Sequence, residues 1–171
     1  MIRLPGQRVR YAPLVAGSAA AFLLAAPMAP ASAASPVTDL NCTITVATDL
    51  HPGLTPQPQH VAFTSHGLTG SATCTGTVNG QPVTGPGRFA IHSQGTVSDC
   101  TEATIAGSFV LKIPTSDGTT TVAGRFTSTS SGGLTTASGD LAGTATVTSV
   151  VGDCTTTPIT RATSVWVVHV T

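Results

Sequence analysis

Residues 68–80 of the 171-residue chain read Leu-Thr-Gly-Ser-Ala-Thr-Cys-Thr-Gly-Thr-Val-Asn-Gly. Apolar or small residues alternate with threonine or serine over most of this stretch, which is typical of a strand with one buried face. The closing pair Asn79-Gly80 predicts a two-residue hairpin turn. Counting outward from that turn places Gly70 opposite Phe89, so that a bare glycine backbone lies beside an aromatic ring.

Two later turns extend the pattern toward the C-terminus. Ser116-Asp117-Gly118-Thr119 predicts a hairpin that places Gly124 opposite Leu111. Gly132-Gly133 predicts another hairpin, in which Gly124 lies opposite Leu141 on its other side. Three successive strands would then share one apolar face, so the sequence predicts an antiparallel meander.

Further strands are expected at both ends of this meander. Alternating residues predict a strand over 40–46 and a short one over 61–63, and residues 164–170 predict a closing strand that contains Trp166. About eight strands result, a number at which a sheet can close on itself. The predicted fold class is therefore all-β, an antiparallel up-and-down barrel stapled by disulfides. A β-sandwich is the alternative.

The first 33 residues have the features of a secretory signal peptide. Arg3, Arg8 and Arg10 precede an apolar run over 14–26, and Ala31-Ser32-Ala33 follows as a small-residue cleavage site. The apolar run is shorter than the roughly 20 residues that a membrane span requires. No paired arginines are present, which favours the general secretory route. We expect a secreted protein whose mature form, residues 34–171, is a single domain without a membrane span.

The charge of residues 34–171 restricts the partners of the mature chain. Four Lys and Arg stand against seven Asp and Glu, which leaves a net charge of −3. A mildly acidic domain is a poor partner for phosphate backbones and anionic membrane surfaces, so no nucleic-acid partner is predicted. The oligomeric state stays open.

The four cysteines, Cys42, Cys74, Cys100 and Cys154, all lie in this part of the chain. An even number in an exported protein predicts two disulfides. A zinc site is disfavoured because neighbouring cysteines are at least 26 positions apart. Three connectivities are conceivable. We predict Cys42–Cys74, since both have the inward phase of early strands, and Cys100–Cys154, since both follow Asp and precede Thr in loops.

The polar residues predict no catalytic centre. The chain has no Gly-x-Ser-x-Gly, and Asp99, Asp117 and Asp153 stand in turn-like positions where aspartate usually bonds its own backbone. His51, His60 and His66 could be imagined as metal ligands, but their spacing fits solvated loop residues better. We therefore predict no catalytic residue, no metal and no cofactor.

The inward-facing positions of the predicted strands are strongly apolar. A packed core is the simpler interpretation of such a stripe, and a small apolar ligand cavity is the alternative, because glycines and alanines on the same face leave volume unfilled. The first interpretation favours a structural or surface-interaction protein and the second a binding protein. A secreted isomerase or hydrolase is a third hypothesis. The candidate cavity residues are Phe89, Ile91, Phe109, Leu111, Phe126, Leu141 and Trp166.

Three stretches carry a resemblance to known proteins: Ala72-Thr-Cys-Thr-Gly-Thr-Val-Asn-Gly80, Val83-Thr-Gly-Pro-Gly87 and Gly152-Asp-Cys-Thr-Thr-Thr-Pro158. Together they resemble a group of small exported β-rich proteins of actinobacteria, over most of the chain from Leu68 onward. The shared motifs are turns and cysteines. The resemblance therefore implies a common fold and export, and it implies no reaction and no site residues.

Overall fold

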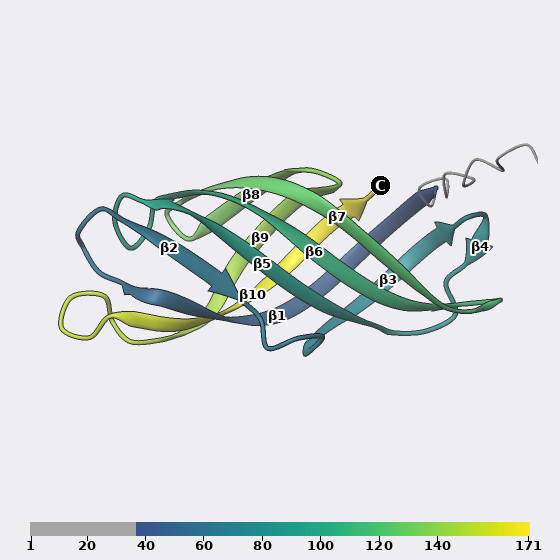
Figure 1. Ribbon diagram of the computed structural model, residues 1–171, viewed down its shortest axis with the longest axis horizontal. Helices are drawn as coiled ribbons and strands as arrows, with labels where there is room; N and C mark the ends of the chain where they lie inside the picture. Colours follow the sequence, from purple (N-terminus) through teal and green to yellow (C-terminus); the bar gives the residue numbers. More distant parts are fainter. Residues whose placement is uncertain (1–36) are drawn as a thin grey trace, which may run out of the picture. The chain divides into compact units, whose positions relative to one another are not determined.

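A computed structural model describes residues 37–171, which form one antiparallel sheet of ten strands. The predicted signal peptide, residues 1–33, lies outside the described residues. The strands are β1 (Thr38–Leu54), β2 (Gln59–Thr64), β3 (Gly70–Val78), β4 (Gln81–Pro82), β5 (Gly87–Val97), β6 (Ala103–Thr115), β7 (Gly118–Ser131), β8 (Leu134–Gly139), β9 (Leu141–Val151) and β10 (Ile159–Val170) (Figure 1).

The sheet closes into a ring because β1 is paired along both of its edges. One edge of β1 pairs with β10, from Leu40 opposite Val170 to Asp49 opposite Arg161. The other edge pairs with β3 over its first half and with β2 near residues 49–51. The ring contains eight strands: β1, β2, β5, β6, β7, β8, β9 and β10. The closed antiparallel sheet predicted from the sequence is confirmed.

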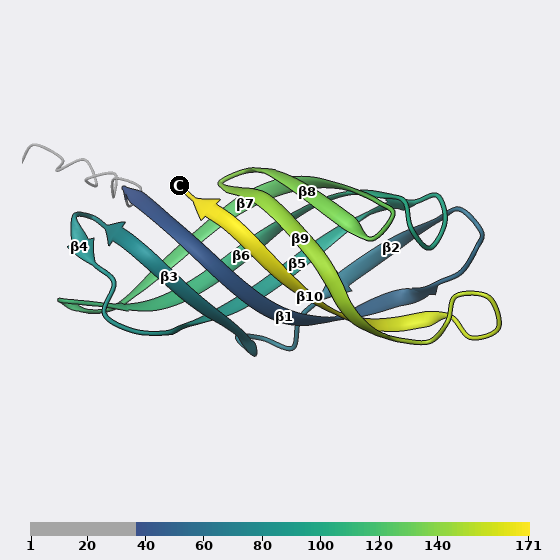
Figure 2. The ribbon, with the colours of Figure 1, turned by 180° about the vertical axis from the view of Figure 1, so that it is seen from behind.

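The β3–β4 hairpin fills the space that the short strand β2 leaves between β1 and β5. β5 pairs with β3 over residues 87–89 and with β2 over residues 92–97. The seam between β1 and β5 is thus bridged by β3 toward one end of the ring and by β2 toward the other. Loops 55–58, 98–102 and 152–158 gather at the β2 end (Figures 1 and 2), which we call the loop end.

Side chains alternate between the inside and the outside of the ring. In β1 the burial alternates from Thr38 to Leu50, and β5 continues the pattern with Phe89, Ile91 and Ser93 buried. Successive strand residues point to opposite faces, so each alternating segment supplies one apolar side to a common interior. The predicted division into an inner and an outer face is therefore correct.

Two of the three predicted turns have the expected register. Asn79 has φ +52° and Gly80 has φ +77°, and Gly132 and Gly133 also have positive φ, as a type I′ hairpin turn requires. Counting outward from these two turns gives pairs that the sheet contains, among them Gly70–Phe89, Ala72–Gly87 and Phe126–Gly139.

The hairpin between β6 and β7 is two residues away from the predicted register. Ser116 and Asp117 form its tip. A tip at Asp117-Gly118 would need positive φ at both residues, and Asp117 does not have it. A shift by two residues keeps every side chain on its predicted face. In place of the predicted Gly124–Leu111 pair, the sheet contains Phe109–Gly124, Leu111–Val122 and Gly107–Phe126.

β8 and β9 form a further hairpin where the sequence predicts one continuous strand. The chain turns at Asp140, whose backbone N–H donates to the Arg125 carbonyl at 2.9 Å. The Arg125 N–H in turn donates to the Asp140 carboxylate at 2.8 Å. Gly124 lies against Asp140 as a result, and Leu141 pairs with Val170 instead. The predicted Gly124–Leu141 pair is therefore wrong.

Both predicted disulfides are present. Cys42 and Cys74 face each other directly in the β1–β3 ladder, with their Cα atoms 4.1 Å apart. β2 does not separate them, because it pairs with a later part of β1. Cys100 and Cys154 join loops 98–102 and 152–158 with a Cα–Cα distance of 6.2 Å. Within residues 37–171 no helix is long and apolar enough to cross a membrane.

Candidate functional site

The interior of the ring contains two separate clusters of buried apolar side chains. The larger cluster contains the four aromatic residues Phe89, Phe109, Phe126 and Trp166 and extends along β1 from Leu40 to Val46. The smaller cluster lies at the loop end and contains Leu50, Leu54, Val61, Val97, Cys154 and Ile159.

A cavity of about 270 Å³ lies between the two clusters. Ile91, Ala145 and Trp166 line it from the larger cluster, and Leu50, Val97 and Ile159 line it from the smaller one. Protein interiors are ordinarily packed with few gaps larger than a water molecule. A space of this size between two packed clusters is therefore the candidate binding site.

The structure buries all seven predicted cavity residues, but it brings only Ile91 and Trp166 to the cavity. The other five fill the larger cluster. Phe89 and Phe109 stack with ring centroids 6.0 Å apart, and Phe126 meets Trp166 edge-on at 6.1 Å. Most of the predicted stripe is thus packed core, and the open space lies nearer the loop end.

Five hydroxyl side chains from five different strands also line the cavity: Thr48, Ser93, Ser130, Thr135 and Ser164. We call this set the hydroxyl belt. Ser130 and Thr135 bond each other at 2.7 Å, and the Trp166 indole N–H donates to Ser164 at 2.8 Å. Thr48 donates to the Ala162 carbonyl at 3.4 Å.

Ser93 differs from the rest of the belt because its hydroxyl has no hydrogen-bond partner. The side chain is 1% exposed and lies on the inner face of β5, between Phe63 of β2 and Gly107 of β6. A buried hydroxyl without a partner loses its bonds to water and gains none in return, which is unfavourable by about 1–3 kcal/mol. Ser93 is therefore an unsatisfied polar group in the wall of the cavity.

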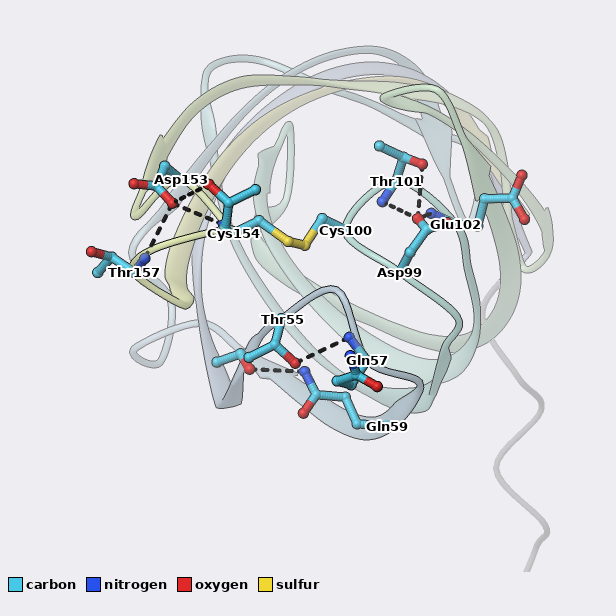
Figure 3. The surroundings of a disulfide bond; sticks show 12 residues. Thr55, Gln57, Gln59, Asp99, Cys100, Thr101, Glu102, Asp153, Cys154 and Thr157 are labelled. Atoms are coloured by element: carbon cyan, nitrogen blue, oxygen red, sulfur yellow. Dashed lines mark hydrogen bonds between the residues drawn. A yellow bond between two sulfur atoms is a disulfide. The ribbon is translucent and has the colours of Figure 1, made fainter.

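The mouth of the cavity is acidic and is crossed by a disulfide. Asp99, Cys100, Thr101 and Glu102 line it from loop 98–102. Figure 3 shows the Cys100–Cys154 link lying across the end of the ring, with Asp99 to one side and Asp153 to the other. Among the described residues that line the cavity there is no Lys, Arg or His.

The aspartates of these loops bond neighbouring backbone, as predicted. Asp99 accepts the Thr101 N–H at 2.6 Å, the Thr101 hydroxyl at 2.8 Å and the Glu102 N–H at 3.0 Å. These bonds, led by the one from the Thr101 backbone, lower the pKa of Asp99 below its usual value. Hydrogen bonds to a carboxylate stabilise its charged form, so the Asp99 carboxylate stays ionised at the mouth at neutral pH.

The histidines lie away from this cavity. His92 is on the outer face of β5, where its Nδ1 lies 3.0 Å from the Thr64 hydroxyl, and His169 lies beside Asn41 on the outer face. His66 pairs with Asp49, while His51 and His60 are exposed on β1 and β2. Across residues 37–171 no three His, Cys, Asp or Glu side chains are grouped to hold a metal ion.

A shallower hollow of about 700 Å³ lies partly over the outer face of β5, β6 and β7. His92, Arg125 and Asp140 contribute to it, and all three are exposed. A ligand in this hollow would keep most of its contact with water. The inner cavity, which can remove an apolar molecule from water, is for this reason the stronger candidate.

Reasoning from the sequence missed the hydroxyl belt, although the signal was present. Ser93 has the same phase as Phe89 and Ile91, so the alternation that predicts an apolar stripe also places this hydroxyl inside. Ser130 and Ser164 likewise share the phase of Phe126 and Trp166. Polar residues in an inward phase are the informative exceptions to a hydrophobic pattern.

Comparisons of the chain with protein-family models, with curated proteins and with solved structures found no match. The cavity, its lining and its mouth are therefore the features that bear on function.

Proposed function

We propose that this chain is exported and that its mature form binds a small, predominantly apolar molecule in the cavity between the two buried clusters. The space of about 270 Å³ between the two clusters is the observation that carries the proposal. Small-molecule sites are mostly apolar concave spaces with a few polar groups that fix orientation. Apolar side chains of both clusters and the five-residue hydroxyl belt match that description.

Export is supported by two independent features. The N-terminal 33 residues have the charge, apolar run and small-residue site of a signal peptide. Both disulfides join residues of the described part of the chain, and disulfides persist mainly in oxidising, extracytoplasmic environments.

Trp166 makes the binding proposal directly testable, because it is the only tryptophan of the chain and lines the cavity. Bromobenzene is apolar and uncharged, and its bromine quenches tryptophan emission on contact. We expect quenching of Trp166 that saturates with bromobenzene concentration. The matched variants are Ala145→Leu, which places carbon atoms in the cavity, and Ala123→Leu, which places them on the outer face of β7.

Ala145→Leu should abolish the saturable quenching, and Ala123→Leu should retain it. The free energy of unfolding of both variants is measured in urea, so that loss of binding is separated from loss of the fold. Purely collisional quenching that is the same in wild type and Ala145→Leu would overturn the proposal.

A structural or surface-interaction role is the second candidate. The packing of Phe89, Phe109, Leu111, Phe126 and Leu141 into a filled cluster favours it, since most of the interior then serves stability alone. In that case the threonine- and serine-rich outer face would carry the function. If quenching of Trp166 by bromobenzene does not saturate while the fold is intact, the structural or surface-interaction role becomes the preferred hypothesis.

A further inference from the structure

The hydroxyl belt indicates what kind of molecule the cavity accepts. An interior that serves only as a core gains nothing from buried hydroxyls, since each must recover the hydrogen bonds it loses on leaving water. Here five hydroxyl side chains line one space, contributed by β1, β5, β7, β8 and β10, and two of them, Thr48 and Ser93, are buried. Hydroxyl groups both donate and accept, so the belt can pair with an alcohol or with a carbonyl.

Ser93 is the member of the belt that a ligand would satisfy. The other four have partners within the protein, whereas the Ser93 hydroxyl has none and the residue is 1% exposed. A polar atom of a bound molecule can supply the missing hydrogen bond. The ligand that gains most is one that carries a single polar group on an apolar body.

The charges around the cavity select against an anion. Asp99 and Glu102 lie at the mouth, and the described lining residues include no basic side chain. An ionised group buried without a partner is strongly unfavourable, and a carboxylate would also pass two like charges on entry. A neutral polar group meets neither obstacle.

The volume limits the size of the molecule. An apolar cavity of about 150 Å³ holds one benzene, so a space of about 270 Å³ corresponds to roughly ten or eleven non-hydrogen atoms. Long-chain lipids exceed this size, and small alcohols, aldehydes and ketones of medium chain length match it.

We propose that the cavity binds small uncharged amphiphiles, namely medium-chain alcohols, aldehydes or ketones, with their one polar group hydrogen-bonded to Ser93 of the hydroxyl belt. This assignment rests on the proposed binding function and names its ligand class. The apolar part of the ligand lies against Leu50, Val97 and Ile159 toward the loop end.

The first test compares four compounds of matched length: octan-1-ol, n-nonane, octanoate and octylammonium. Each compound is titrated into the protein with bromobenzene bound, and its displacement of bromobenzene is followed by Trp166 emission. The volatile compounds are supplied from the vapour so that their solubility is not limiting. We expect octan-1-ol to bind about three- to tenfold more tightly than n-nonane, the ratio that one net hydrogen bond confers. Octanoate should bind more weakly than both.

The second test removes the hydrogen-bonding group. Ser93→Ala should weaken octan-1-ol binding by about three- to tenfold and leave n-nonane binding unchanged or tighter. Ser108→Ala is the matched control, since Ser108 is exposed on the outer face of β6 and should change neither. Unfolding in urea shows that both variants are folded, and Ser93→Ala should not be less stable, because it deletes an unsatisfied buried hydroxyl.

The outcomes separate this inference from the broader binding proposal. Equal affinities for octan-1-ol and n-nonane, or no selective effect of Ser93→Ala, would overturn the hydrogen-bond assignment while the binding proposal stands. Octylammonium or octanoate as the tightest ligand would also overturn it, because the head group would then be recognised by charge. If none of the four displaces bromobenzene and bromobenzene itself does not saturate, the binding proposal fails as well.

Discussion

Gly70 allows β3 to approach β5 closely enough for Phe89 to be fully buried. A Cβ atom at this position would lie 2.9 Å from the Phe89 carbonyl oxygen and 3.2 Å from the Val46 Cβ. Contacts this short force backbone or side chain to move. Gly85 is the opposite case: the nearest atom to a Cβ there is the Pro114 Cγ, at an ordinary 3.4 Å.

Gly70→Ala should therefore lower the free energy of unfolding by about 1–3 kcal/mol, the usual effect of overpacking a close contact. Gly85→Ala should change it by less than about 0.5 kcal/mol. Urea unfolding followed by Trp166 fluorescence measures both. Equal free energies of unfolding of the two variants would show that β3 can shift away from β5 without loss of stability.

At the level of elements, the loops that carry Cys100 and Cys154 are built alike. In each loop the aspartate directly before the cysteine accepts bonds, through its carboxylate, from residues that follow it. Asp153 accepts the backbone N–H groups of Thr155, Thr156 and Thr157 at 2.8, 2.7 and 3.1 Å. The Asp-Cys-Thr triplets thus predict loop geometry, and the carboxylates hold each cysteine in place for the disulfide.

The pH dependence of stability should reveal the Asp153 contribution. The Thr156 hydroxyl, the largest cause, and three backbone N–H groups lower the pKa of Asp153 well below its usual value. A carboxyl with a lower pKa in the folded state stabilises the fold above its unfolded pKa of about 3.9, and this contribution is lost as pH falls through the folded pKa.

Asp153→Asn should accordingly be less stable than wild type at pH 7, with a constant difference down to about pH 4 that shrinks at lower pH. Thermal unfolding between pH 7 and pH 2 measures it. Asp117→Asn, in the exposed tip of the β6–β7 hairpin, is the control and should follow the wild-type curve. A difference that widened on acidification would contradict the assignment.

In the molecule as a whole, the two disulfides act on different kinds of structure. Cys42–Cys74 joins strands that a continuous ladder already holds in register. Cys100–Cys154 joins two loops, and its cysteines are 54 residues apart in the chain. One loop connects β5 with β6 and the other connects β9 with β10, and neither strand of the first pair is hydrogen-bonded to a strand of the second. The second link is the covalent tie across the loop end, above the mouth of the cavity.

The double variant Cys100→Ser/Cys154→Ser should lose about 2–4 kcal/mol in free energy of unfolding, chiefly because the unfolded chain regains freedom. Guanidinium unfolding without reductant measures this loss. Addition of reductant should destabilise the variant further, since Cys42–Cys74 is then also broken. No difference between the variant and the oxidised wild type would mean that the loop end is held by its packing alone.

The alternation of residues and the turn motifs were enough to predict which side chains face inward and where most turns lie. Alternation along a strand is a property of neighbouring residues, so Phe89, Phe109 and Phe126 could be assigned to one interior without knowing which strands pair. Asn79-Gly80 and Gly132-Gly133 set their registers because only a few residue types adopt positive φ at both tip positions. Ser116-Asp117-Gly118 admitted two tips, and the register there moved by two residues.

Three features emerged only in the folded protein: β2 and β3 share one edge of β1, the chain turns at Asp140, and a cavity remains between two clusters. These features depend on contacts between residues distant in the chain. The hydroxyl belt shows this most clearly, because its members come from five strands and become neighbours only when the ring closes. A local pattern can place each of those hydroxyls inside, but the space they surround is what all the inward side chains together leave unfilled.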